Sequence, residues 1–296
     1  MSRIAYRRQT RHTAAQRGKG LLIGLGIALA LVFTLWPPVW LFITSLKHTI
    51  EIFHWPPTFI PQNPTLGNYG IILTGRDPES NVSYPVLPAF VHSCIVALAT
   101  ATISTVVATC AAYSLARKRM RLMAGLFVAI LVMRTIPRIS IAIPLYLVIQ
   151  QLGMLDTLQG LILTHITVVL PLATFLMYSF FQDLPDELEE AALVDGASRL
   201  RAFVRIVVPL VAPGIAVTAI IAFILSYNEF LYSLIVVSTQ QSMTLPVALS
   251  GFILEYGIRW DLLSAAGFLA VIPIIVFSFF VQRHIVRGLS LGAVKG

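Results

Sequence analysis

Long apolar runs separated by short polar connections extend along almost the whole chain. Six of them reach the roughly 20 residues that an α-helix needs to cross the hydrocarbon core of a bilayer. These runs are residues 20–45, 88–116, 122–151, 158–181, 207–237 and 262–281. The pattern therefore predicts an all-α, polytopic membrane protein with six transmembrane helices.

The composition fits a chain surrounded by lipid. Of its 296 residues, 57% are hydrophobic and only 11% are charged, whereas about a quarter of the residues in an average soluble protein are charged. So few charges cannot coat a water-soluble globule of this length. The composition excludes an ordinary cytosolic enzyme and indicates one membrane domain that accounts for nearly the whole chain.

The basic residues indicate how the chain is oriented. A net charge of +8 could suggest nucleic acid, but most Lys and Arg residues lie in short clusters beside the apolar runs, which favours a role in topology. Sixteen of the 21 lie in the two terminal tails and in alternate connections, and three lie in the opposite set of connections. Because cytoplasmic segments carry the excess of Lys and Arg, both termini are predicted to be cytoplasmic. No nucleic-acid partner is expected.

This topology divides the chain into a basic cytoplasmic tail, residues 1–19, a six-span transmembrane domain, 20–282, and a cytoplasmic C-terminal tail, 283–296. The proline-rich external loop, 46–87, reads as an irregular cap, and a charged cytoplasmic loop occupies 182–206. The first apolar run could instead be a cleaved signal peptide. It is too long for such a segment and lacks a convincing cleavage site, so we expect it to be retained as a span.

Metal, thiol and nucleotide chemistry are not indicated. Cys94 and Cys110 share one apolar run, so neither a disulfide framework nor a thiolate site is expected. No group of His, Cys and carboxylate residues has the spacing of metal ligands. The phosphate-binding pattern Gly-x-x-x-x-Gly-Lys-Ser/Thr does not occur, so the chain is expected to bind no cofactor of its own.

The cytoplasmic loop contains the signals for two short helices. Pro185 suits a first helical turn, and the acidic residues that follow place negative charge at the positive end of the helix dipole. Gly196 can adopt the left-handed conformation that ends a helix. A second helix is predicted to begin near Ser198. Its apolar residues recur at helical spacing, at Leu200, Phe203, Val204 and Val207.

An ordinary reading of this loop is an amphipathic interfacial helix with a solvated charge run, but its spacing is more specific. Glu190-Ala191-Ala192, followed by Gly196 and later by Val208-Pro209, resembles the EAA loop of ATP-binding-cassette importer permeases, whose pattern ends in Leu-Pro. The resemblance implies a helix that docks into a cleft on a separate ATPase subunit. The residues implied in this ATPase coupling are Glu187, Glu190, Ala191, Ala192, Asp195 and Gly196.

The C-terminal sequence from Gln282 to Gly296 is similar to the tail of carbohydrate-uptake permeases of the maltose and glycerol-3-phosphate type, and specifically to their smaller six-span partner. The resemblance extends over residues 88–296. It implies a C-terminal contact with the ATPases, with Gly288, Gly292 and Lys295 as candidate contact residues.

The resemblance also implies the assembly and its location. A second permease subunit, two ATP-binding subunits and an extracytoplasmic solute-binding protein are the expected partners, with a sugar or sugar derivative as substrate in the bacterial inner membrane. ATP and Mg²⁺ would be bound by the ATPase subunits. The chain itself is expected to be a non-catalytic membrane subunit that moves when the ATPases close.

Two arginines within the third apolar run are candidates for the substrate pathway. Arg134 and Arg138 are four residues apart, on one face of the expected helix, with Pro137 between them. Charged residues inside a span tend to face a cavity or a partner. They could bind carbonyls freed at a proline kink, pair with the second permease, or line the pathway and favour an anionic or heavily hydroxylated solute.

A second candidate group lies in the fifth run. Tyr227, Asn228 and Glu229 are predicted to lie in the outer half of this span. An amide can exchange hydrogen bonds with sugar hydroxyls, and aromatic rings can stack on the apolar face of a pyranose. Helix packing is the alternative role for these aromatic residues, and His165 and Cys94 are also interpreted as packing residues.

Two other classes of membrane protein would need features that can be sought in the sequence. An ion-coupled secondary transporter would need buried carboxylates as coupling sites or an inverted repeat, and Glu229 is the one acid within an expected span. An intramembrane enzyme would need paired Asp residues, or Ser with His, at one depth, and the sequence indicates neither.

Overall fold

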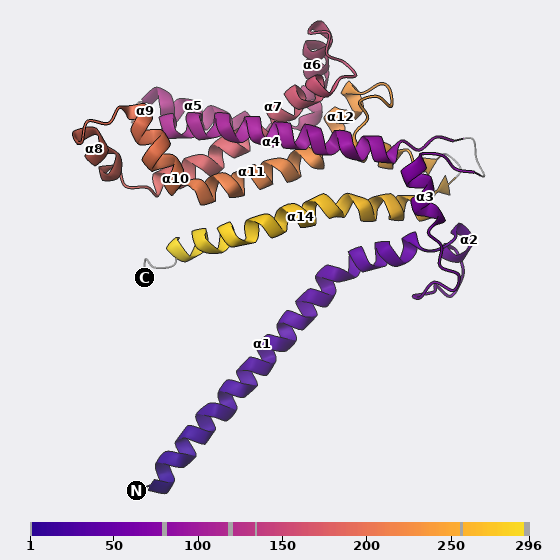
Figure 1. Ribbon diagram of the computed structural model, residues 1–296, viewed down its shortest axis with the longest axis horizontal. Helices are drawn as coiled ribbons and strands as arrows, with labels where there is room; N and C mark the ends of the chain where they lie inside the picture. The colour runs from indigo at the N-terminus through magenta and orange to yellow at the C-terminus, as the bar shows by residue number, and fades with distance from the viewer. Residues whose placement is uncertain (1, 79–81, 118–120, 134, 255–256, 293–296) are drawn as a thin grey trace.

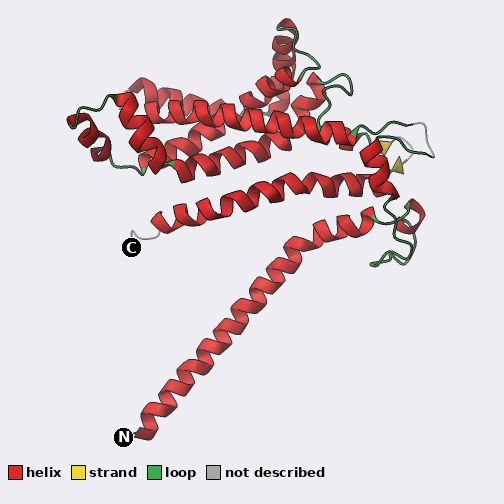
Figure 2. Ribbon diagram, viewed as in Figure 1, coloured by secondary structure: helices red, strands yellow, loops and turns green. Residues whose placement is uncertain are grey.

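Helices make up almost all of the regular structure in the computed structural model (Figures 1 and 2). It describes residues 2–78, 82–117, 121–133, 135–254 and 257–292. Within these ranges, four helical segments are long and apolar enough to cross a membrane. They are Lys19–Ser45 of α1 (Ser2–Ser45), α4 (Val86–Arg117), α7 (Leu158–Gln182) and Trp260–Phe279 of α14 (Trp260–Gly292). These four correspond to the first, second, fourth and sixth predicted spans.

The predicted third span is not one helix. It consists of α5 (Arg121–Met133) and α6 (Arg138–Gln151), separated by a turn. Pro137 at the start of α6 is extended, with φ −56° and ψ 129°, and a proline also disfavours helical backbone at the residue before it. The third predicted span is therefore not the single helix that the sequence indicates. Arg138 begins a new helix, and Arg134 lies outside the described residues.

The predicted fifth span is also divided. After α9 (Arg199–Ala202), the chain forms the π-helix η1 (Phe203–Val207), α10 (Val208–Leu210) and then α11 (Ala212–Tyr227). The segments Arg199–Leu210 and Ala212–Tyr227 meet at 74°, so they form a fifth span only if the bent pair is counted as one. A second break separates α11 from α12 (Leu231–Val236).

The core lies where α4 packs along α7 and α11 (Figure 1). One face of α4 carries small buried residues, among them Ala97, Thr100 and Ala108, and small side chains let membrane helices approach closely. Gly214 of α11 lies against the ring of Phe180 on α7. An added β-carbon there would stand 2.5 Å from a ring atom. Close packing of the three helices thus depends on residues with little or no side chain.

The connections at the α3 end of the bundle are folded onto it. They contain α2 (Thr49–Ile52), α3 (Gly67–Thr74), α13 (Leu245–Ser250) and a hairpin of β1 (Ile253–Leu254) with β2 (Gly257–Ile258). This small hairpin departs from the all-α expectation. Ile72 and Tyr84 join the hydrophobic core with Phe252 and Leu262. The predicted irregular cap is therefore attached to the helical bundle through its own apolar side chains.

The ends of the chain share one side of the molecule. The first turns of α1 and the last turns of α14 point toward the end where α8 (Glu187–Val194) lies (Figure 1). α1 packs against α14 near its own C-terminal end and diverges from the bundle toward its start (Figure 1). α14 is helical through Gly292, so the first part of the predicted C-terminal tail continues the last helix.

Candidate functional site

The short helix α8 begins and ends as its sequence predicts. Glu187, Glu189 and Glu190 occupy its first turn, where negative charge stabilises the helix dipole. At its end Gly196 has φ +84°. The Gly196 amide donates to the Leu193 carbonyl at 3.1 Å, and the Ala197 amide donates to the Ala192 carbonyl at 3.0 Å. This pair of bonds is a Schellman motif, so the predicted left-handed glycine is confirmed.

The two faces of α8 differ in exposure. Ala192 is buried toward the bundle, whereas Glu187, Glu190, Ala191 and Asp195 are exposed. Two larger apolar side chains on the helix are also open, Leu188 and Val194, with Val194 87% exposed. The outward face therefore combines acidic groups, one small residue and uncovered apolar surface, which is the composition of a surface that a protein partner could cover.

A polar cluster fastens the base of α8 to the end of α4. The Tyr113 hydroxyl donates to Glu189, and Arg117 forms an ion pair with Asp186. Arg117 also donates to the Leu184 carbonyl at 3.1 Å and pairs with Glu189 through Nε at 3.2 Å. We refer to Tyr113, Arg117, Asp186 and Glu189 as the α4–α8 cluster.

Aromatic side chains of α7 and η1 pack against Tyr113 of the α4–α8 cluster. The Tyr113 ring lies 4.5 Å from the Phe203 ring and 5.8 Å from the Phe181 ring, between centroids. The side chains of Arg117 and Glu189 are 14% and 13% exposed. Glu189 was expected only to stabilise the helix dipole, and no role was predicted for Tyr113. Their partners lie about 70 positions away in the chain, and no local spacing connects them.

The helix after Gly196 differs from its prediction in one respect. Ser198 caps α9 by accepting from the Arg201 amide at 3.3 Å, as a helix start near Ser198 requires. Val207 is fully buried, but Leu200 and Val204 are exposed, so the four apolar residues do not share one buried face. The π-helix η1 adds a residue to one turn and thereby rotates the residues around it.

A second polar group lies at the break between α11 and α12. Glu229 is 3% exposed, and its carboxylate pairs with Arg138 Nη1 at 3.0 Å. The same carboxylate accepts from the Tyr232 amide at 3.2 Å, and the Tyr232 hydroxyl donates to the Arg138 carbonyl at 3.1 Å. Arg138 is thus paired within its own chain, an arrangement that the sequence analysis did not consider. The Arg138–Glu229 pair joins the breaks of two spans.

His165 of α7 connects this break to the core. Its Nδ1 lies 2.8 Å from the Ser226 hydroxyl, and its Nε2 lies 3.0 Å from the Ser233 hydroxyl. Ser233 in turn donates to the Glu229 carbonyl at 3.1 Å. His165 is almost fully buried, so both ring nitrogens need partners. It is more than the packing residue that the sequence suggested, because it bridges α7, α11 and α12.

The other candidates in this region face different environments. Tyr227 is buried and its ring lies 5.5 Å from that of Phe223, which favours the packing alternative for this residue. Asn228 is exposed and donates to the Ile224 carbonyl at 2.9 Å. Phe230 is 39% exposed. Asn228 and Phe230 are therefore not covered by this chain.

Asp156 is a structural residue that the sequence analysis missed. It has a positive φ of 55° in the turn before α7. Its carboxylate accepts from the Ser238 and Thr239 amides, both at 3.1 Å, and from the Thr239 hydroxyl at 2.6 Å and the Ser242 hydroxyl at 2.5 Å. Burial acts against the charged form, but these hydrogen bonds outweigh it and lower the pKa of Asp156 to about 2.

The remaining candidates are only partly placed. Gly288 and Gly292 lie in the last turns of α14, whereas Lys295 lies outside the described residues. Among the residues that were described, no group of three or more His, Cys, Asp or Glu is arranged to hold a metal ion.

Comparison with known proteins identifies the class. The family described as "Binding-protein-dependent transport system inner membrane component" matches residues 104–291. The trehalose transport system permease protein SugB of Mycobacterium tuberculosis is 37% identical, with 90% of this chain and 95% of SugB covered. The trehalose/maltose transport system permease protein MalG of Thermococcus litoralis is 33% identical, with 94% and 98% covered.

A solved structure agrees with the fold. A crystal structure of a bacterial ABC transporter involved in the import of the acidic polysaccharide alginate superposes with a TM-score of 0.73. It covers 91% of this chain and 97% of that chain at 19% identity, so this likeness concerns the fold alone.

The chain belongs to the family of binding-protein-dependent transport system inner membrane components. It is therefore a multi-pass inner-membrane permease subunit of an ABC importer, a non-catalytic component of a larger transport complex. This assignment confirms the resemblance drawn from Glu190-Ala191-Ala192 and Gly196, and it sets aside the ion-coupled alternative.

Proposed function

We propose that α8 is the coupling helix of this permease, inserted into a cleft on an ATPase subunit. The observation that carries the proposal is the exposed acidic and apolar face of α8, held at one end by the α4–α8 cluster and ended at the other by the Schellman motif at Gly196. In this role Ala191 permits close approach, Glu190 meets a cation of the ATPase, and Gly196 sets the angle to α9.

The full assembly would contain a second permease subunit, two ATP-binding subunits that hold ATP and Mg²⁺, and an extracytoplasmic solute-binding protein. The chain would cross the membrane six times, with both termini and α8 in the cytoplasm and with no cofactor of its own. The common direction of the start of α1, the end of α14 and α8 supports this topology (Figure 1). Gly288, Gly292 and Lys295 would contribute a second contact with the ATPases.

The proposed substrate is a sugar or sugar derivative. The relatives SugB and MalG are permeases for trehalose and for trehalose/maltose, which supports a disaccharide. Arg138 and Asn228 are exposed enough to meet such a solute. Glu229 offsets the charge of Arg138, so their pair has no net charge. It offers a neutral solute hydrogen-bond donors, and it weakens the case for an anionic one.

The coupling role can be tested in proteoliposomes that contain the permease pair and the ATPases. Exchanging Glu190 for Lys should reverse the charge at the proposed contact and reduce both ATPase binding and ATP-driven uptake. Asp183→Lys, which reverses an exposed acidic residue at the end of α7 and outside α8, is a matched charge control and should leave ATPase binding unchanged. Unchanged ATPase binding by a stably inserted Glu190→Lys variant would refute the proposed contact.

A further inference from the structure

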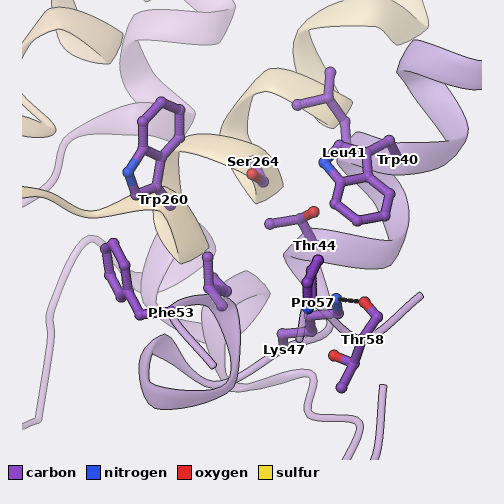
Figure 3. Close-up of a pocket in the computed structure, with 10 residues that line it drawn as sticks. Trp40, Leu41, Thr44, Lys47, Phe53, Pro57, Thr58, Trp260 and Ser264 are labelled. Atoms are coloured by element: carbon purple, nitrogen blue, oxygen red, sulfur yellow. Dashed lines mark hydrogen bonds between the residues drawn. The ribbon is translucent and has the colours of Figure 1, made fainter. Parts of the chain in front are cut away.

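A cavity of about 320 Å³ lies at the α3 end of the molecule, away from both sites described above. The last turns of α1, the connection after it and the start of α14 enclose the space (Figure 3). Trp260 and Phe53 stand on one side of it, and Trp40 with Lys47 stands on the other, with Thr44 and Ser264 between them (Figure 3). Its walls are thus mainly apolar, with three aromatic side chains and a few polar groups.

Lys47 is incompletely satisfied in this wall. The residue is 3% exposed, and its ammonium donates to the Thr58 carbonyl and stands 5.1 Å from the centroid of the Trp40 ring. An ammonium has three donors, and no carboxylate in the described ranges forms an ion pair with this one. A buried ammonium that forms no ion pair and has donors to spare is costly, so this arrangement favours a further acceptor such as an anion.

Thr44 provides an independent indication of a polar ligand. It lines the same cavity, is 7% exposed, and its hydroxyl has no hydrogen-bond partner within the described structure. Glu51 is close enough for the charge of Lys47 to act on it. Its carboxylate is already bound by the Thr58 hydroxyl and the Gln62 amide, each at 2.9 Å. An unused cationic donor and an unused hydroxyl therefore meet at one cavity.

The position of the cavity indicates where its ligand comes from. The membrane-crossing stretch of α1 ends at Ser45, one residue after Thr44. Trp36, Trp40 and Phe59 form a ring cluster beside the cavity, with centroids 5.7–6.4 Å apart, as is typical of aromatic residues at the bilayer–water interface. The part of α1 that precedes the cavity is exposed and apolar, for example at Phe33 and Val39. A lipid could lay its acyl chains there.

We propose that this cavity binds the phosphate of an anionic glycerophospholipid, with Lys47 and Thr44 as headgroup ligands and Trp40 and Trp260 as walls. The lipid would join α1 to α14 at the interface, where α1 begins to diverge from the bundle. The proposal is independent of the coupling role of α8.

The test is to count phosphatidylglycerol and phosphatidylcholine molecules that remain bound to the purified transport complex by native mass spectrometry. We expect phosphatidylglycerol to be retained preferentially. Lys47→Met should reduce its retention about tenfold, and Thr44→Val, which keeps the shape of the side chain, about threefold. Lys47→Arg should retain most of the binding. Lys19→Met, which removes an exposed lysine at the other end of the span, should have no effect.

Three results would overturn the proposal. One is equal retention of the two lipids, and another is undiminished phosphatidylglycerol in both Lys47→Met and Thr44→Val. The third is displacement of the lipid by the transported sugar, because that would make the cavity a sugar site. Inorganic phosphate added alone should not compete, since it lacks the acyl chains. Effective competition by it would refute the lipid as the specific ligand.

Discussion

The α4–α8 cluster and the Arg138–Glu229 pair both place charged side chains where helices are interrupted, but they do so in opposite ways. At α8 the ion pairs hold the base of a helix whose outer face stays open. At the break between α11 and α12 the carboxylate is buried and its cation is more than half exposed, 3% against 56%. In the first region the ion pairs hold α8 so that its outer face stays exposed. In the second region the ion pair neutralises a buried carboxylate, and its arginine remains accessible.

The difference separates two physical uses of ionic contacts. The pair of Arg117 with Glu189 joins two side chains that are 14% and 13% exposed, so water screens it little and it fixes the position of α8. A pair with one buried member is asymmetric, since removing the exposed member leaves the other charged and without solvent.

The largest effect is expected from Arg138→Gln. It leaves the Glu229 carboxylate buried with its cation removed, which should cost about 3 kcal/mol of stability. Glu229→Gln should cost less, because Arg138 is already largely exposed. The double variant should recover much of the loss. Thermal unfolding of the purified permease complex measures all three, and equal losses in the two single variants would contradict the asymmetry.

Breaking the α4–α8 cluster should affect coupling more than stability. Arg117→Met removes the ion pairs to Asp186 and Glu189, and hydrogen bonds to charged groups are worth about 1.5–3 kcal/mol each. ATP-driven uptake should fall about tenfold while α8 still binds the ATPase. Tyr113→Phe, which loses only a hydroxyl, is the milder companion variant. If Arg117→Met instead lost ATPase binding, while each complex that still formed transported normally, the cluster would serve docking and not coupling.

Gly196 tests the open side of α8 without touching an ion pair. Its φ of +84° costs a β-branched residue roughly 1–2 kcal/mol, and no neighbouring atom lies within 4 Å of an added β-carbon. Gly196→Val should therefore reduce uptake through backbone strain alone. Gly196→Asn should keep most of it, because asparagine tolerates the left-handed region. Similar uptake by the two variants, at equal expression, would contradict the proposal that Gly196 sets the angle between α8 and α9.

The smallest effect is expected at Asp156, which belongs neither to the α4–α8 cluster nor to the Arg138–Glu229 pair. Its pKa is lowered from 3.8 to about 2 in the folded chain. The hydrogen bonds to Ser238, Thr239 and Ser242 therefore stabilise the fold above pH 3.8 and are lost as the pH falls toward 2. Between pH 6 and pH 3 the parent should lose about 2–4 °C more in melting temperature than Asp156→Asn, because the variant lacks this titrating group. A pH dependence in Asp156→Asn equal to that of the parent would contradict this prediction.

The sequence predicted α8 because its determinants are local. The acids of the first turn, Gly196 and Ser198 each act within a few residues of their position. Four of the spans could be predicted equally well, because apolar length alone identifies them.

The Arg138–Glu229 pair and the helix breaks around it could not be predicted from the sequence, because the contacts are distant in the chain or the local signals are ambiguous. Arg138 and Glu229 are 91 positions apart, and no periodicity reports such a pairing. Pro137 was visible in the sequence, but a kink within one helix and a break between two helices look alike there. The π-helix η1 has no cue of its own, so the exposed sides of Leu200 and Val204 could not be anticipated.

The distance in sequence between Arg138 and Glu229 also has a consequence for biosynthesis. At a ribosomal rate of about 5–20 residues per second, the 91 positions between them take roughly 5–20 s to translate. During that interval α6 has left the ribosome while its counter-charge has not yet been made. The nascent permease must keep Arg138 near water or against the insertion machinery, and the third and fifth spans can settle together only after translation has passed residue 229.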